Sequence, residues 1–282
     1  MLLTQSLLAL ALQVGPNQST IPPTDLHQEM RDREPSPSTA EEMDDPSSLW
    51  LAQCLALLEE DAARAHTMAQ LQRNATSGAE RVLANHCLGL AATELGLWDD
   101  AVTAFTAARD ETPADEARAR ARFGMMAGNA ALGGYDVPAS ETLLRQAMLD
   151  AQASGSAPLQ SIAASDLARA LVSMGRPEDA LAELEQATSL APDNPESWLL
   201  KATLLRRLER YEAAQPAIER AGELAPTNPA VGLEAGVIAL FAGREDAARA
   251  SWQSVIDLAP ESPEADTAQN YLDQIAERDP QQ

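Results

Sequence analysis

Histidine and cysteine are the residue types in this chain best suited to metal binding or nucleophilic chemistry, and they are few. They are His27, Cys54, His66, His86 and Cys87. Structural zinc sites use closely paired ligands, and the sequence has no His-x-x-x-His pair. A site built from His86 and the two cysteines is therefore disfavoured, and we expect neither a metal nor another cofactor.

Motifs of known catalytic sites are also missing. The sequence has no glycine-rich phosphate loop, no nucleophile elbow and no kinase signature. Its many Asp and Glu side chains fall where a solvated helix face would place them. We therefore expect a protein that is not an enzyme.

The composition indicates an all-α fold and narrows the choice of partners. Hydrophobic residues make up 45% of the chain but aromatics only 4%, and alanine, which favours helix, fills much of the apolar share. The formal net charge is −23, and Lys201 is the only lysine. Because phosphate binding needs clustered Lys or Arg, we expect neither nucleic acid nor an anionic membrane surface as partner. The acidity also suits a long helical array that stays soluble.

Prolines mark an internal repeat. Pro192, Pro226 and Pro260 are spaced 34 residues apart, since 226 − 192 and 260 − 226 both equal 34, and each ends the phrase Leu-Ala-Pro. Units counted from Val82, Ser161, Pro195 and Pro229 share one register, with alanine at position twenty in all four. Position eight is small and position twenty-four is large: Gly89, Ala168, Ala202 and Gly236, then Phe105, Leu184, Ile218 and Trp252.

This register has a physical explanation in a helical hairpin. Small residues at positions eight and twenty let two helices cross closely, and the large residue at twenty-four fills the gap to the next unit. Glycine at position fifteen ends the first helix in the left-handed conformation, as at Gly96, Gly175 and Gly243. Proline at position thirty-two stops the second helix.

A 34-residue period with these positions resembles the bacterial-type tetratricopeptide repeat (TPR) family. The resemblance implies an all-α, right-handed superhelical solenoid of helix-turn-helix repeats with a C-terminal capping helix. We expect about six units over residues 48–278, with the cap from Pro263 to Ile275 and a short tail at 279–282. Asp266, Gln269, Asp273 and Glu277 would form the polar side of the cap.

Two units depart from the regular length. Pro113 and Pro158 are 45 residues apart, so the third unit has eleven residues more than the period. We expect five of them before its frame and six after it, the latter as a polar loop over Ala153–Pro158. The first unit, near Ser48–Ser77, has a shortened turn in which Asp61 caps the second helix.

The cysteines fall in the first helices of units one and two. First helices of successive TPR units are neighbours, so the two sulfurs are expected near each other. In an oxidising compartment, Cys54 and Cys87 would form a disulfide clamp. The alternative is a pair of buried thiols that act as small hydrophobes.

The resemblance implies a ligand surface on the concave face, built by the first helices. Its arginines suit a carboxylate or an acidic segment; alternatively they pair with acids of neighbouring helices, and the apolar end packs under the cap. Asn129 and Lys201 alone do not reproduce the clamp of chaperone-binding TPR domains. The surface is expected to include Arg122, Asn129, Arg169, Leu199, Thr203, Arg206, Arg207, Leu233, Val237 and Phe241.

The amino terminus has the layout of an exported protein. The apolar run Met1–Val14 is shorter than the roughly 20 residues of a membrane span but suits a signal peptide, with Ala9-Leu10-Ala11 as a cleavage site. No basic residue precedes the run, which a signal peptide would have. Residues 15–47 are rich in Pro, Ser, Thr and acids and read as a disordered linker. We expect a periplasmic or exported protein; the alternative is a cytoplasmic one whose first helix packs on the array.

Together these features predict a scaffold that binds an as yet unidentified protein or peptide in its concave groove, in the assembly of the cell envelope. Two alternatives stay open, namely a self-associating structural array and an accessory subunit of an enzyme encoded elsewhere. Nothing in the sequence indicates a homo-oligomer or a transmembrane span.

Overall fold

The computed structural model describes residues 46–278. The predicted leader, Met1–Val14, and the tail at 279–282 lie outside the described residues. So does the predicted linker, apart from Pro46 and Ser47, which begin the first described helix. This helix begins two residues before residue 48, where the array is predicted to start.

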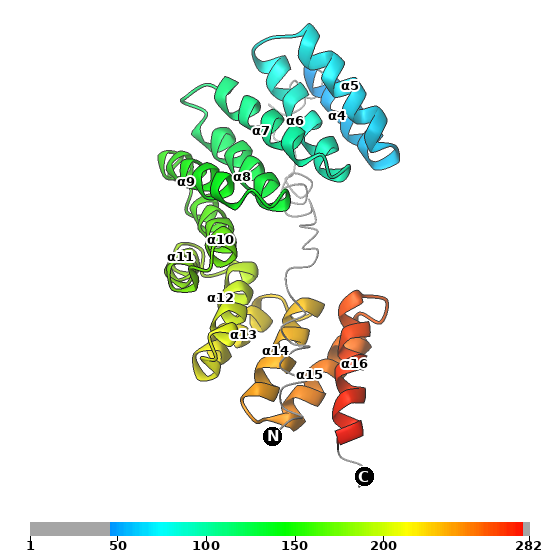
Figure 1. Ribbon diagram of the computed structural model, residues 1–282, viewed down its shortest axis with the longest axis vertical. Helices are drawn as coiled ribbons and strands as arrows, with labels where there is room; N and C mark the ends of the chain where they lie inside the picture. Colours follow the sequence, from blue (N-terminus) through cyan, green and yellow to red (C-terminus); the bar gives the residue numbers. More distant parts are fainter. Residues whose placement is uncertain (1–45, 279–282) are drawn as a thin grey trace, which may run out of the picture. The chain divides into compact units, whose positions relative to one another are not determined.

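The described chain is entirely α-helical (Figure 1). Six helical hairpins follow one another and a single helix closes the array. The helices are α4 (Pro46–Glu60), α5 (Ala62–Ala75), α6 (Ala79–Glu94), α7 (Trp98–Glu111), α8 (Ala117–Gly133), α9 (Val137–Ala153), α10 (Ala157–Ser173), α11 (Pro177–Leu190), α12 (Pro195–Arg207), α13 (Tyr211–Leu224), α14 (Pro229–Phe241), α15 (Glu245–Leu258) and α16 (Pro263–Arg278).

From Leu51 onward the helices form one compact unit. From α6 to α15 the two helices of each hairpin pack together, and from α5 onward each second helix packs on the first helix that follows it. First helices also contact the next first helix, from α8 through α10, α12 and α14 to α16. This places the first helices on the inner side of a superhelical repeat fold, as the TPR resemblance implies.

From the second hairpin onward, a residue in the left-handed conformation follows each first helix, and three of these residues are the predicted glycines. Gly96, Gly175 and Gly243 have φ of 69°, 70° and 74°. The equivalent positions of the third and fifth hairpins hold Tyr135 and Glu209, with φ of 62° and 58°. The backbone keeps this turn even where a side chain makes it costly.

Positions eight and twenty-four face each other in the three hairpins that have glycine at position eight. A Cβ at Gly89 would lie 2.5 Å from the Phe105 ring, and one at Gly128 would lie 2.5 Å from Leu144 Cγ. The close crossing expected from small residues is therefore confirmed. Phe105 also clusters with alanines of the next first helix, α8, so the large residue joins successive hairpins as predicted.

The extra residues of the third unit lengthen helices instead of forming a loop. The helices α8, α9 and α10 have 17 residues each, whereas α11 has 14. Only Ser154–Ser156 separate α9 from α10, with Gly155 at φ 68°. The predicted loop over Ala153–Pro158 is wrong, because Ala157 and Pro158 already belong to the first turn of α10.

The local structure at both ends of the array agrees with the predicted helix cap and the predicted polar side of the last helix. The Asp61 side chain accepts a hydrogen bond from Arg64 N at 3.0 Å and so caps α5. On α16, Ala265, Tyr271 and Ile275 are buried in a core shared with Trp252 of α15. The predicted polar side of α16 is exposed.

Candidate binding surface

A hydrogen-bonded chain of polar side chains crosses the inner side of three first helices. Asn129 Nδ2 on α8 donates to Asp166 Oδ2 on α10 at 2.9 Å. Arg169 donates from Nη1 to Asp166 Oδ1 and from Nη2 to Glu196 Oε1 on α12, both at 2.6 Å. The predicted site residues Asn129 and Arg169 thus meet in one network.

Asp166 is the member of this network that sequence reasoning missed. It is 4% exposed, and burial raises the pKa of its carboxyl, although Arg169 and Asn129 act in the opposite direction. Asn129 Oδ1 is buried and has no hydrogen-bond partner among the described residues. An acid in an otherwise apolar stretch of α10 was the available signal for Asp166.

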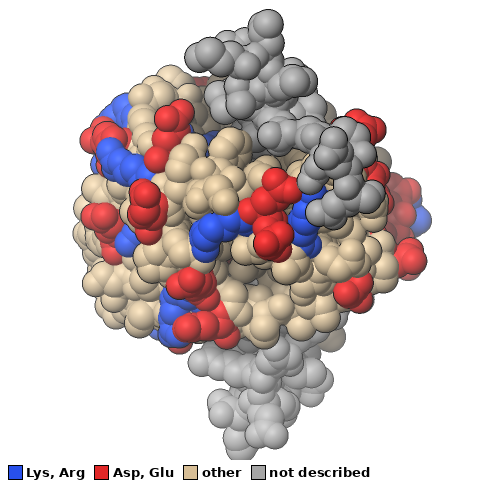
Figure 2. All heavy atoms as spheres, turned by 90° about the horizontal axis from the view of Figure 1, so that it is seen from below, with Lys and Arg blue, Asp and Glu red and all other residues tan. Residues whose placement is uncertain are grey.

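A second ion pair connects α12 to α14. Arg206 donates from Nε to Glu234 Oε1 at 2.5 Å, and the two side chains are only 10% and 13% exposed. With Arg169, two of the four predicted arginines therefore pair with acids of neighbouring helices, which was the alternative interpretation. Figure 2 shows the same pattern of Lys and Arg side chains beside Asp and Glu on the face in view.

The other predicted residues of α8 and α12 are more open. Arg122 is half-buried on α8, and Leu199 and Thr203 are half-buried on α12. Arg207, at the end of α12, is exposed. Leu199 and Thr203 lie on α12 between its two ion pairs, and Arg207 lies just after the second; these three residues are called the inner surface below.

The apolar end of the predicted groove packs under the cap. Val237 is 8% exposed and belongs to the core that includes Trp252 and α16, so its placement in an open groove was wrong. Leu233 and Phe241 are partly buried against the same core. Phe241 also stacks on Tyr211, with ring centroids 5.6 Å apart.

The two cysteines lie together between the first helices α4 and α6. Cys54 and Cys87 form a disulfide, with Cα atoms 6.4 Å apart, and both residues are fully buried. The bond ties the first hairpin to the second.

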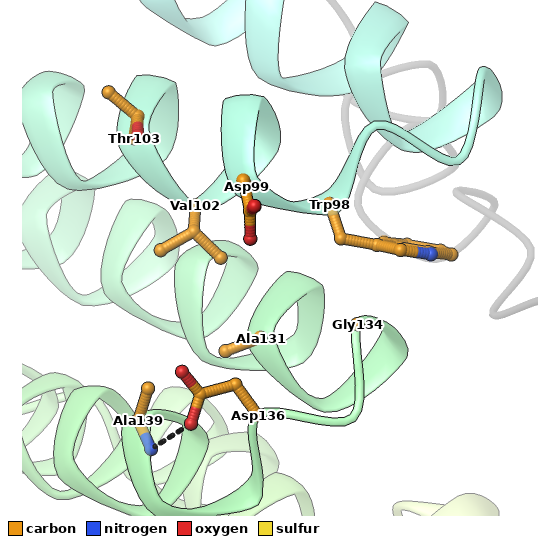
Figure 3. Close-up of a pocket in the computed structure, with 8 residues that line it drawn as sticks. All are labelled: Trp98, Asp99, Val102, Thr103, Ala131, Gly134, Asp136 and Ala139. Carbon is orange, nitrogen blue, oxygen red and sulfur yellow. Dashed lines mark hydrogen bonds between the residues drawn. The ribbon is translucent and has the colours of Figure 1, made fainter.

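A separate pocket opens at the start of α7 and α9 (Figure 3). Trp98, Asp99 and Val102 line it from α7, and Gly134 and Asp136 line it from the α8–α9 turn. The carboxylates of Asp99 and Asp136 both point into the space between the two helices.

Residues 46–278 contain neither a metal-binding cluster nor a membrane-spanning helix. Nowhere in that range do three His, Cys, Asp or Glu side chains cluster closely enough to hold a metal ion. The helices in that range are also too short or too polar to cross a bilayer.

Comparisons with known proteins agree on one fold. Residues 165–229 match the family model described as tetratricopeptide repeat. The solved structure of PilF from Pseudomonas aeruginosa is similar, with a TM-score of 0.59 and 18% identity, over 80% of this chain and 97% of that one. No match was found among curated protein sequences.

Two further solved structures are similar to the chain. The APC/C hetero-tetramer Cut9–Hcn1 has a TM-score of 0.59 and 14% identity, over 81% of this chain and 43% of that one. A MamA fragment from Desulfovibrio magneticus RS-1 has a TM-score of 0.51 and 15% identity, over 64% of this chain and 97% of that one. With identities between 14% and 18%, the similarity to these structures indicates the fold alone.

Proposed function

Because the chain is a tetratricopeptide repeat protein, we propose that it is a non-catalytic scaffold that holds a peptide or protein segment against its inner surface. The all-α superhelical repeat fold is in general one of protein–protein interaction. Such solenoids use an extended surface, built from equivalent positions of stacked repeats, to bind a partner.

One observation carries this proposal, namely the setting of Leu199, Thr203 and Arg207. Leu199 and Thr203 lie on α12 between the Arg169–Glu196 and Arg206–Glu234 ion pairs, and Arg207 directly follows the second pair. The ion pairs fix the surrounding side chains, so a partner segment would meet a surface that is already ordered. Ordering in advance lowers the entropic cost of binding. Arg207 adds an exposed positive charge that suits an acidic group of the partner.

We also propose that the protein is exported and acts in the cell envelope. The apolar run Met1–Val14 and the Cys54–Cys87 disulfide support this, because disulfides persist in oxidising compartments. Cell fractionation with mass spectrometry of the mature amino terminus tests the proposal. Recovery of soluble cytosolic protein with its leader intact would contradict it.

Site-specific photo-crosslinking tests the binding surface. A benzophenone amino acid at residue 203 should capture the partner in cells. The matched control is the same amino acid at Gln186, an exposed residue of the second helix α11. Equal capture from both positions, or capture from residue 186 alone, would refute the inner surface as the binding site.

The matched pair Thr203→Arg and Gln186→Arg measures the effect on affinity. The Thr203 side chain has no hydrogen-bond partner among residues 46–278, and both variants add the same charge. We expect Thr203→Arg to weaken capture of the crosslinked partner and Gln186→Arg to leave it unchanged. Circular dichroism confirms that both variants are folded.

A further inference from the structure

The second helices of the last three hairpins begin with arginine. Arg176, Arg210 and Arg244 are the N-cap residues of α11, α13 and α15, at position sixteen of the register. None of these side chains caps its own helix by a hydrogen bond. Any role that the three arginines share must therefore come from contacts outside their own helices.

Each of these arginines reaches back to the second helix of the preceding hairpin. Arg210 donates from Nη2 and Nη1 to the two carboxylate oxygens of Glu178, at 2.7 and 3.1 Å. Arg176 donates from Nη1 to Glu141 Oε1 at 2.8 Å, and Arg244 donates to Gln215. The acceptors occupy position eighteen or twenty-one of the preceding unit. A guanidinium group therefore bridges successive second helices at three junctions.

The junction between α7 and α9 lacks this guanidinium group. Its position sixteen is Asp136, and positions eighteen and twenty-one of the preceding unit are Asp99 and Val102. Asp136 Oδ1 accepts a hydrogen bond from Ala139 N at 3.1 Å, which leaves its other oxygen open. Neither Asp99 nor Asp136 forms an ion pair with any residue in the described range.

The pocket of Figure 3 occupies the place of the missing arginine. Asp99, Val102 and Asp136 all line it, and they are the three residues that the register equates with the bridge elsewhere. Trp98 forms one end, where its ring packs on Gly133 and Gly134. The two carboxylates and the apolar Val102 side chain thus line a space that corresponds to the place of the guanidinium group at the three later junctions, while the Trp98 ring extends to the far side of the turn.

We propose that this pocket binds an arginine side chain of a partner protein. The guanidinium group would lie between Asp99 and Asp136, as that of Arg210 lies on Glu178, and its aliphatic stem would contact Val102. Arginine fits better than lysine because its planar fork can donate hydrogen bonds to two carboxylates in different directions.

Exposed apolar residues beside the pocket indicate a polypeptide as the source of that arginine. Leu95 and Leu97, in the turn before Trp98, are 39% and 44% exposed. Tyr135, between the lining residues Gly134 and Asp136, is 89% exposed and holds a left-handed conformation that glycine takes in three other hairpins. Asp99 and Asp136 are themselves exposed, and accessible charges beside exposed tyrosine and leucine side chains suit contact with a polypeptide. This surface lies at the turns between helices, so it is independent of the inner surface proposed above.

Titration of the full chain with a capped Ala-Arg-Ala peptide, followed by NMR, tests the proposal. The reporter is the indole N–H signal of Trp98, assigned with a Trp98→Phe variant. The charge variant is Asp99→Asn, which leaves the cap of α9 intact. Its matched control is Glu212→Gln, an exposed acid at position eighteen of α13.

We expect the arginine peptide to shift the Trp98 signal saturably and the isosteric citrulline peptide not to do so. Asp99→Asn should weaken binding about tenfold, since a charge-assisted hydrogen bond is lost, whereas Glu212→Gln should not. Asp136→Arg, which restores the bridge within the chain, should abolish binding in a protein that is still folded. A citrulline peptide of equal affinity, an unchanged affinity in Asp99→Asn, or the absence of a saturable shift would each overturn the proposal.

Discussion

Gly236 of α14 lies against the indole ring of Trp252 of α15, and the Trp252 Nε1–H donates to the Leu233 carbonyl at 3.1 Å. The ring is 1% exposed, so it fills the space that a side chain at residue 236 would need. The contact joins the two helices of the last hairpin and continues to the cap through Tyr271, whose ring centroid is 5.0 Å from that of Trp252.

Gly236→Ala should therefore destabilise the protein by about 1–3 kcal/mol, because the added methyl group forces the rigid indole ring to move. The matched control is Gly222→Ala in α13, where the nearest atom to the new Cβ is 3.9 Å away. That change should stabilise the protein by up to about 1 kcal/mol through helix propensity. Urea unfolding midpoints measure both, and a Gly236→Ala variant as stable as the parent would contradict the packing.

Reduction of the Cys54–Cys87 disulfide should lower stability by about 3–4 kcal/mol, because the bond closes a long loop in the unfolded chain. Thermal unfolding with and without reductant measures the loss, and a Cys54→Ala/Cys87→Ala variant should unfold at the same temperature in both conditions. Intact-mass spectrometry of alkylated protein, unfolded without reductant, should detect no modified cysteine. Two alkylated cysteines in that sample would rule out the disulfide.

Glu209→Gly should stabilise the array by about 1 kcal/mol, since a left-handed residue with a side chain is strained and glycine is not. The opposite change at an equivalent turn, Gly175→Ala, should destabilise it by a similar amount. Denaturation midpoints of the two variants are compared with the parent. A loss of stability in Glu209→Gly would show that this turn holds no strain.

Asp166→Asn should raise stability at neutral pH. Burial raises the pKa of the Asp166 carboxyl in the folded protein above its value in the unfolded chain. Above the unfolded pKa, ionisation of this carboxyl therefore favours the unfolded state and lowers the free energy of unfolding. Asparagine has no proton to lose, so the gain should be largest at pH 7 and vanish as the pH falls below the unfolded pKa of about 3.9. Thermal midpoints from pH 7 to pH 4 measure the trend. A destabilised variant at pH 7 would mean that the Arg169 ion pair outweighs burial.

The register was predictable because local rules determine it. Glycine at a left-handed turn and a small residue opposite a large one act within one hairpin, as at Gly96 and at Gly89 with Phe105. The polar stretch around Ser156 was misjudged, since its small residues resemble a loop. Ser156 and Pro158 stand at the N-cap and first turn of α10, where serine and proline are favoured.

The inner surface was harder to predict because its chemistry depends on contacts between helices. Whether Arg206 is free or paired is decided by Glu234, which lies 28 residues away on α14. Asp166 is likewise tolerated at a buried position because Asn129 of α8 and Arg169 of α10 donate hydrogen bonds to its carboxylate. Sequence spacing alone does not show which of these side chains meet.

The disulfide between α4 and α6 also sets the order in which the array opens. Stacked repeats fray from their ends, because a terminal repeat has only one neighbour to hold it. With Cys54 bonded to Cys87, the first hairpin cannot detach from the second, and fraying begins at α16. Under reducing conditions, both ends are free to fray. The redox state of the compartment thus decides whether the first hairpin, as well as α16, is exposed to proteases and chaperones.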